Sequence, residues 1–220
     1  MKNINGKLII PVVVAITTYM ISYWIPKFIV DINEVHYVYT SIDTLIPLFS
    51  PAVIIYISSF IQWIIAIFIL LKQDTIFGYK VSLAIIIGSI IGFIIFLVFP
   101  TGVLRTNFEI NNVFDWILSQ IYFVDNPINA CPSFHCFCST ITIIILKYSK
   151  NIDNKYRIIN TIFSILVYAS TLLTKQHYLI DVPTGILTAY LSYLISDKLI
   201  KNKKLNLCYC NIKLNKQIND

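Results

Sequence analysis

The chain is poor in charge and in glycine for its size. Of its 220 residues, 13% are charged and only 6 are glycine, whereas 57% are hydrophobic. A soluble domain is typically about 25% charged and about 45–50% apolar, and a fold of this length could not bury so much apolar surface in water. Disordered chains are poor in aliphatic and aromatic residues, so disorder is excluded as well. Five cysteines are too few for a disulfide scaffold, which leaves an integral membrane protein.

Six long apolar segments run along the chain, and a membrane helix needs roughly 20 such residues. The segments are continuously apolar rather than alternating, which disfavours a β-barrel, and the scarcity of glycine favours helices packed through branched side chains. The predicted spans are, to within several residues, 8–30, 45–71, 81–99, 132–148, 158–174 and 181–200. We therefore expect an all-α, polytopic bundle of six transmembrane helices, with one membrane domain, 1–200, and a basic tail, 201–220.

The cations are divided unevenly between the two sides of this topology. With six spans both termini lie on one side, which carries 14 of the 17 Lys and Arg residues, and the other side carries Lys27, Arg105 and Lys175. Because positive residues favour the cytoplasm, we expect a multi-pass protein of the cell membrane with both termini cytoplasmic. Topology thus accounts for the pI near 9.0, and no nucleic-acid partner is predicted. The long outer connection, 100–131, is expected to include a short interfacial helix within 113–123.

Most of the remaining polar chemistry lies at outer span ends, where ionisable residues are functional candidates by default. The candidates are Arg105 after the third span, Ser133 and His135 at the start of the fourth, and Lys175, His177 and Asp181 between the fifth and sixth. Arg105 alone could merely anchor a helix end, and Ser133 could merely cap a helix. Their gathering on one side of the membrane favours a common site.

The residue types of this site suit a phosphate. Arg105 and Lys175 provide positive charge, while the start of the fourth span offers backbone N–H groups and the Ser133 hydroxyl to an anion. Asp181, four residues after His177, can hold one imidazole nitrogen and leave the other free to attack. His135 has the chemistry of a general acid at the leaving oxygen.

With these residues the chain resembles the type 2 phosphatidic acid phosphatase superfamily, whose members act on membrane lipids. The family's second motif, Pro-Ser-Gly-His, reads Pro132-Ser133-Phe134-His135 here, and its third motif ends in His-x-x-x-Asp, as His177 and Asp181 do. The resemblance implies an outward-facing lipid phosphatase or phosphotransferase in which His177 forms a phosphohistidine, Asp181 orients it and His135 is acid and base. It further implies a lipid phosphate or diphosphate as substrate, and no metal or other cofactor.

The chain also departs from the family's pattern. Val98 stands where the first motif has Lys, Thr106 replaces the Pro after Arg105, and Phe134 replaces the Gly of the second motif. The Lys-Gln-His-Tyr-x-x-Asp-Val sequence around His177 resembles the branch that contains inositol phosphorylceramide synthases, which pass a phospho-headgroup to a lipid alcohol. Transfer to water and transfer to an alcohol therefore both stay open.

Two further interpretations compete with catalysis at this site. Cys131, His135, Cys136 and Cys138 resemble a metal-binding cluster, but on a helix Cys136 and Cys138 point about 200° apart. A non-catalytic binder or transporter of an anionic lipid could use the same cations and histidines, although transporter sites usually lie near the bilayer midplane. The third histidine, His36, is expected to be an interfacial surface residue. The sequence predicts no oligomeric state.

Overall fold

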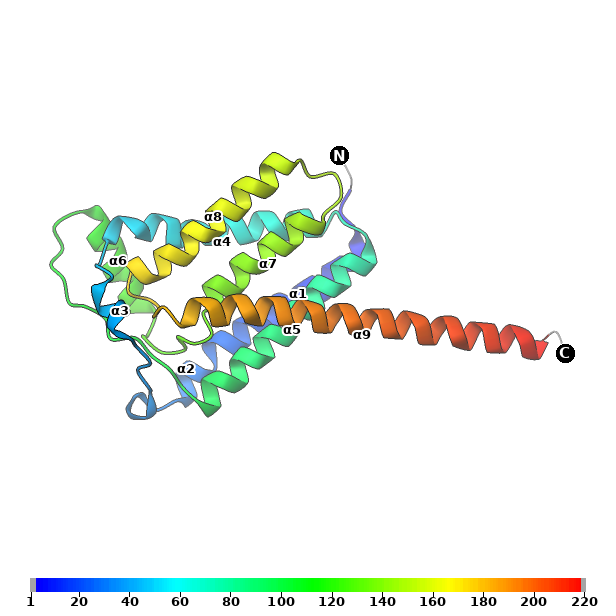
Figure 1. The fold of residues 1–220 in the computed structure, drawn as a ribbon, viewed down its shortest axis with the longest axis horizontal. Coiled ribbons are helices and arrows are strands. Elements are labelled where there is room, and N and C mark those ends of the chain that lie inside the picture. The colour runs from blue at the N-terminus through cyan, green and yellow to red at the C-terminus, as the bar shows by residue number, and fades with distance from the viewer. Residues whose placement is uncertain (1–2, 219–220) are drawn as a thin grey trace.

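The computed structural model describes residues 3–218, with side chains described up to Asn202 (Figure 1). Helices account for 72% of the chain, which confirms the all-α prediction. The α-helices are α1 (Ile9–Trp24), α2 (Pro26–Ile29), α3 (Ser41–Leu45), α4 (Val53–Leu70), α5 (Thr75–Val98), α6 (Val113–Val124), α7 (Phe134–Tyr148), α8 (Asn154–Leu173) and α9 (Asp181–Ile218). Apart from its first two residues, the predicted basic tail, 201–220, lies outside the residues whose side chains are described.

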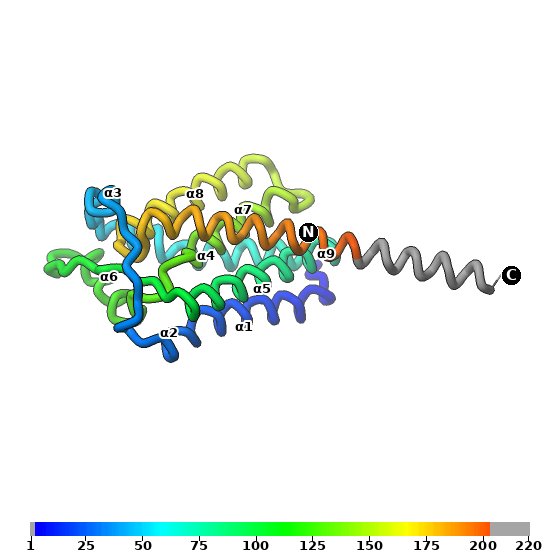
Figure 2. Tube along the Cα trace, turned by 60° about the horizontal axis from the view of Figure 1, so that its bottom comes forward, coloured from blue at the N-terminus to red at the C-terminus, as the bar shows by residue number. Residues whose placement is uncertain are grey.

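The long helices form one bundle in which successive members run in opposite directions (Figures 1 and 2). Helix α5 packs against α1 and α9, and α7 packs against α4, α8 and α9. Helix α7 is therefore the central helix, and most of its residues are buried. Phe137, Ile141 and Ile144 on α7 pack into the main apolar cluster together with Ala66 of α4 and Ala189 of α9.

The outside of the bundle is as apolar as its inside. Large aliphatic side chains such as Ile10 and Leu194 are 75% and 61% exposed, whereas Gln62 is buried and donates from Nε2 to Asn160 Oδ1 (2.9 Å) and Ser164 Oγ (2.8 Å) on α8. Polar groups that bond between helices, with apolar groups facing outward, are typical of a bilayer environment. The helices thus indicate a membrane protein.

Four helical segments among the described residues are long and apolar enough to cross a membrane. They are Gly6–Ile29, Ser50–Leu70, Thr75–Val98 and Asn154–Leu173. Helix α7 is apolar but has only 15 residues, and at about 1.5 Å per residue it is shorter than the hydrocarbon core of a bilayer, about 30 Å. The predicted count of six spans is therefore not confirmed.

Several boundaries differ from the predicted spans for local reasons. Helix α4 begins eight residues later than predicted, because the chain after α3 first passes Pro47 and Pro51. Helix α5 begins earlier, at Thr75, because the Asp74 side chain accepts from Phe77 N (3.0 Å) and caps it. The expected helix within 113–123 is present as α6, capped by Asn112; its place at a membrane interface stays a prediction.

The bundle has two distinct ends. At the terminal end, Asn5 N donates to Leu71 O (2.8 Å) and Lys150 N donates to Gln73 Oε1 (2.8 Å). This end therefore gathers the N-terminal segment with the α4–α5 and α7–α8 connections. The loop end consists of 31–49, 99–133 and 174–180, on the opposite side of the bundle (Figure 1).

The loop end is held together by hydrogen bonds among its segments and to the end of α8. His36 N donates to Pro100 O (2.8 Å), and Phe49 N donates to Leu173 O (2.9 Å). Cys131 N donates to Thr101 Oγ1 (2.7 Å), which ties the residues before α7 to those after α5. All six candidate site residues lie on these segments or on the helix turns next to them.

Candidate active site

The turn between α8 and α9 presents His177. Lys175 adopts a left-handed backbone (φ 51°), and Gln176 N and Lys175 N donate back to Thr171 O and Leu172 O (3.0 and 3.1 Å). This pattern is a Schellman motif, in which the left-handed residue ends the helix and reverses the chain. The reversal places His177 directly after the end of α8.

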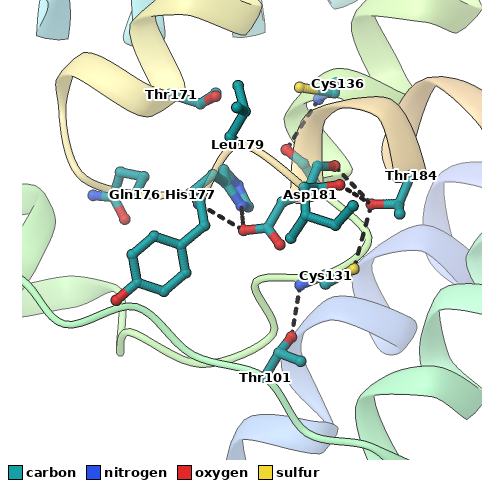
Figure 3. A network of polar contacts seen from close by, with 12 residues as sticks. Thr101, Cys131, Cys136, Thr171, Gln176, His177, Leu179, Asp181 and Thr184 are labelled. Carbon is teal, nitrogen blue, oxygen red and sulfur yellow. Dashed lines mark hydrogen bonds and ion pairs between the residues drawn. The ribbon is translucent and has the colours of Figure 1, made fainter. Parts of the chain in front are cut away.

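Asp181 holds the His177 ring. As the first residue of α9 it is 2% exposed, and its Oδ2 lies 3.3 Å from His177 Nδ1 while accepting from Tyr178 N (2.8 Å) (Figure 3). His177 N itself donates to Thr171 O (3.1 Å). The carboxylate therefore orients the ring through Nδ1 and leaves Nε2 as the nitrogen available for chemistry.

The start of α7 lies next to this turn. Ser133 caps α7 through Oγ, which accepts from Cys136 N (3.3 Å), and Ser133 N donates to Asp181 O (3.1 Å). A Cβ on Gly185 would lie 2.3 Å from Ser133 O, so α7 and α9 can approach this closely only because residue 185 is glycine. His135 consequently faces His177, with 6.3 Å between the ring centroids.

Aromatic side chains of α4 surround His135. The Tyr56 ring stacks on it with centroids 4.1 Å apart, and the Trp63 and Phe60 rings lie at 5.3 and 5.7 Å. His135 is 6% exposed, and its Nε2 has no hydrogen-bond partner among the described residues. Packing rather than hydrogen bonding thus fixes this ring.

Phe134, which stands in place of the motif's Gly, points into the bundle. Its ring lies over Gly92 of α5, where a Cβ would come within 2.3 Å of it. The Tyr19 and Phe96 rings flank it, with centroids at 5.3 and 5.0 Å. The bulky residue is therefore accommodated by a notch in α5, and His135 keeps its place beside His177.

Arg105 joins α6 to the His177 turn. Its guanidinium donates to the carbonyls of Tyr122 (3.0 Å) and Asp125 (2.6 Å) and to Gln176 Oε1 (2.6 Å). It also lies 4.3 Å from the centre of the Tyr122 ring. Burial lowers the pKa of Arg105, an effect that nearby Asp125 opposes. The charge is therefore partly desolvated, and it is bonded to Gln176, the residue that precedes His177.

Lys175 is engaged with the first loop. Its ammonium donates to Asp43 O (3.1 Å) and, in a shorter contact, to Ile46 O. Asp43 in turn accepts from Leu179 N (2.6 Å) through Oδ1. Burial raises the pKa of Asp43, but hydrogen bonds from Thr40 and Leu179 outweigh it and the net pKa is lowered. The loop around α3 thus braces both sides of the His177 turn.

Lys27 is a cation that the sequence did not connect with the candidate site. Its ammonium pairs with Asp125 and lies 4.0 Å from the centre of the Tyr23 ring, and its side chain is 4% exposed. Tyr23 donates to Asp125 Oδ2 (2.8 Å). The backbone carbonyl of Asp125 accepts from Arg105. The signal in the sequence was that Lys27 is one of the three cations on the side that the charge pattern predicts to face outward.

A pocket of about 510 Å³ opens between α1, α4 and α6. His135 lines it together with Tyr56 and Phe60 of α4, Tyr23 of α1 and Asp125 after α6. Apart from Gln120 of α6, the remaining lining is apolar or aromatic and comes from the same helices. This lateral pocket therefore gives access to His135 from the side of the bundle.

The metal-binding interpretation needs Cys131, His135, Cys136 and Cys138 to converge, and the described part of the chain does not show such a cluster. Among those residues there is no group of three or more His, Cys, Asp or Glu side chains able to hold a metal ion. Cys136 packs beside Gly185 of α9, whereas Cys138 faces the gap between α1 and α4. The two thiols thus point toward different helices, as the helical spacing predicted.

Comparison with known protein families shows to which family the chain belongs. The family model of the PAP2 superfamily matches residues 35–195, well over half of the chain. The chain belongs to the PAP2 superfamily. The comparisons with curated proteins and with solved structures gave no match.

Membership of the PAP2 superfamily supports a function of the lipid phosphatase or phosphotransferase type. The matched residues include every candidate site residue, from Arg105 to Asp181. Helices α1 and α2, which carry Tyr19, Tyr23 and Lys27, precede the match. The wall that these helices contribute to the lateral pocket is thus outside the part of the chain that the family model describes.

Proposed function

We propose that this protein transfers the phosphoryl group of a membrane lipid through a phosphohistidine on His177. The observation that carries the proposal is the pairing of His177 with Asp181, facing His135, in a PAP2 superfamily chain. A histidine oriented by a carboxylate has one nitrogen free for attack, and a second histidine beside it can move a proton.

The reaction has two balanced steps. His177 Nε2 attacks phosphorus, the bond from phosphorus to the lipid oxygen breaks, and His135 gives that oxygen a proton. Water or an acceptor alcohol then attacks the phosphohistidine, the phosphorus–nitrogen bond breaks, and His135 takes the proton back.

Arg105 is the cation best placed to hold the phosphate, because its partner Gln176 adjoins His177. Ser133 and Lys175 are proposed to assist at the same site. The proposal is supported by the position of Ser133 as the cap of α7 and by the hydrogen bond from Lys175 that ties the His177 turn to the first loop. Asp181 keeps His177 in the reactive orientation. We further propose that the site faces the extracytoplasmic side of the cell membrane, with both termini in the cytoplasm.

The decisive experiment incubates the purified protein with lipid phosphates and diphosphates in EDTA, with and without acceptor alcohols. Inorganic phosphate and new phospholipid are both measured, so that hydrolysis and transfer are distinguished. We expect chelator-resistant turnover and an acid-labile phosphoenzyme, both abolished in His177→Gln. His36→Gln is the matched control, because this histidine is exposed and its ring stacks on Phe99 at the loop end.

Two results would contradict the proposal. Turnover retained in His177→Gln would exclude this residue as nucleophile. Saturable lipid phosphate binding without any turnover would instead favour a non-catalytic binder or transporter.

A further inference from the structure

A second pocket continues the lateral pocket along the bundle toward the terminal end. It has a volume of about 280 Å³ and, like the first, is lined by Tyr19, Met20 and Phe60. These shared residues form a neck between the two pockets. Beyond the neck the lining is apolar and comes from α1, α4, α5 and α7.

The two pockets form one groove because α1 and α4 pack on different partners. Helix α1 packs mainly on α5, and α4 packs mainly on α7 and α8. Helix α7 therefore lies at the back of the groove, between α1 and α4. At the neck Tyr19 and Trp63 approach edge to face, with centroids 6.5 Å apart. On the outer rim Met20 and Phe60 are 48% and 46% exposed, so the groove is open along the bundle's side.

Four isoleucines line the part of the groove that is farthest from His135 along the helices. They are Ile16 of α1, Ile67 of α4, Ile85 of α5 and Ile145 of α7, and together they are named the isoleucine floor. His135 and Ile145 are separated by ten residues of α7, a length of about 15 Å. The mostly apolar lining between the candidate acid and these isoleucines suits one extended hydrocarbon chain.

We propose that this groove binds one hydrocarbon chain of the substrate and that its isoleucine floor limits the length of chain accepted. The inference rests on the proposed function for the position of the phosphate beside His135 and His177. Continuity with that site identifies the occupant, because a chain whose phosphate lies at His177 enters the groove directly. The substrate class is therefore a lipid phosphate whose chain lies between α1 and α4.

Chain-length dependence tests the floor. With saturated single-chain lipid phosphates of increasing length, kcat/KM should rise about fourfold per added methylene until the chain reaches the floor, and then level off. In Ile16→Trp the plateau should begin at shorter chains, while the shortest substrate is turned over as in the wild type. Ile67→Trp places the same block on the opposite wall. Val14→Trp is the control, because Val14 lies on the outer face of α1 and is 47% exposed.

The chain-length experiment distinguishes the proposed reaction at His177 from the proposed groove. Turnover of the shortest substrate, lost in His177→Gln, establishes the reaction independently of the groove. An unchanged length profile in both blocked variants would overturn the groove proposal alone.

Tryptophan fluorescence provides a readout that needs no turnover. The chain has three tryptophans: Trp24 and Trp116 line the outer pocket, and Trp63 lines the inner one. In His177→Gln, an alkyl phosphate brominated near its phosphate should quench the outer pair, whereas one brominated near its tail should quench Trp63. The tail-dependent quenching should disappear in Trp63→Phe and on displacement by the unbrominated lipid. Equal quenching by a brominated alkane without phosphate, or no dependence on bromine position, would overturn the assignment.

Discussion

His177 and His135 face each other, but the two regions that hold them are built in different ways. His177 sits on a polar turn where Asp181 Oδ2 contacts its ring at Nδ1 and the carbonyl of Thr171 accepts from its backbone N–H. His135 lies on a helix among the rings of Tyr56, Phe60 and Trp63, and its Nε2 lacks a partner among the described residues. A hydrogen-bonded ring has a set tautomer, whereas a ring held by packing keeps a nitrogen free to gain and lose a proton. The difference matches the roles proposed for them, attack and proton transfer.

The largest effect should come from Asp181→Asn. Both His177 Nδ1 and Tyr178 N contact the same oxygen of Asp181, Oδ2. An Asn at this position either keeps its amide oxygen there, without the negative charge that holds the ring proton, or turns its NH₂ group there and faces the Tyr178 N–H with a donor. Because the hold on His177 Nδ1 changes in both cases, we expect turnover to fall by about 10⁴, the loss known for this substitution in a catalytic triad, with little change in melting temperature. The measurement is kcat together with thermal unfolding in detergent.

Asp115→Asn is the matched control for this variant. Asp115 is also buried near the start of a helix and accepts from Asn111 N (3.1 Å), but it has no histidine partner among the described residues. Near-normal turnover in Asp181→Asn would mean that the His177 region needs no fixed tautomer.

His135→Gln should give a smaller effect that depends on the leaving group. Losing a general acid costs about 10²–10⁴ in rate when the leaving group is a lipid alcohol. A phenolate leaving group needs little protonation, so p-nitrophenyl phosphate should lose far less. Parallel kinetics with both substrates make the comparison. An equal loss for both would give His135 a positioning role instead of an acid role.

Gly185→Ala should disturb both regions at once and have the smallest effect of the three. The new Cβ would meet Ser133 O at 2.3 Å and Cys136 Cβ at 3.0 Å, so α7 and α9 must move apart. Overpacking of this kind costs about 1–3 kcal/mol, and the altered distance between the histidines should lower kcat about tenfold. Gly6→Ala, where a Cβ meets nothing within 4 Å, is the control. Unchanged stability and rate would show that α7 and α9 adapt freely.

The polar half of this comparison could be predicted from the sequence. The four-residue spacing of His177 and Asp181 is local. Because successive helices run in opposite directions, the first turns of α7 and α9 lie at the same end of the bundle. The aromatic half could not be predicted. Tyr56, Phe60 and Trp63 recur at helical spacing, but α4 is apolar all round and its sequence does not reveal which face turns inward.

Long-range pairs were also beyond the sequence. Lys27 lies in α2 and Asp125 lies just after α6, and nothing in either segment indicates that they meet. Lys175 was expected to offer its charge to phosphate, and the contacts that it makes with Asp43 and Ile46 depend on where the first loop folds. Such contacts follow from the packing of the whole loop end and not from any local pattern.

The notch at Gly92 has a consequence for how such sequences can change over time. Phe134 fills the space that a side chain at residue 92 would need, so residue 92 must stay glycine as long as residue 134 is large. The constraint runs in one direction only, because a smaller residue at 134 would leave the glycine at 92 without a clash. A large residue at 134 should therefore be found only beside a glycine at 92.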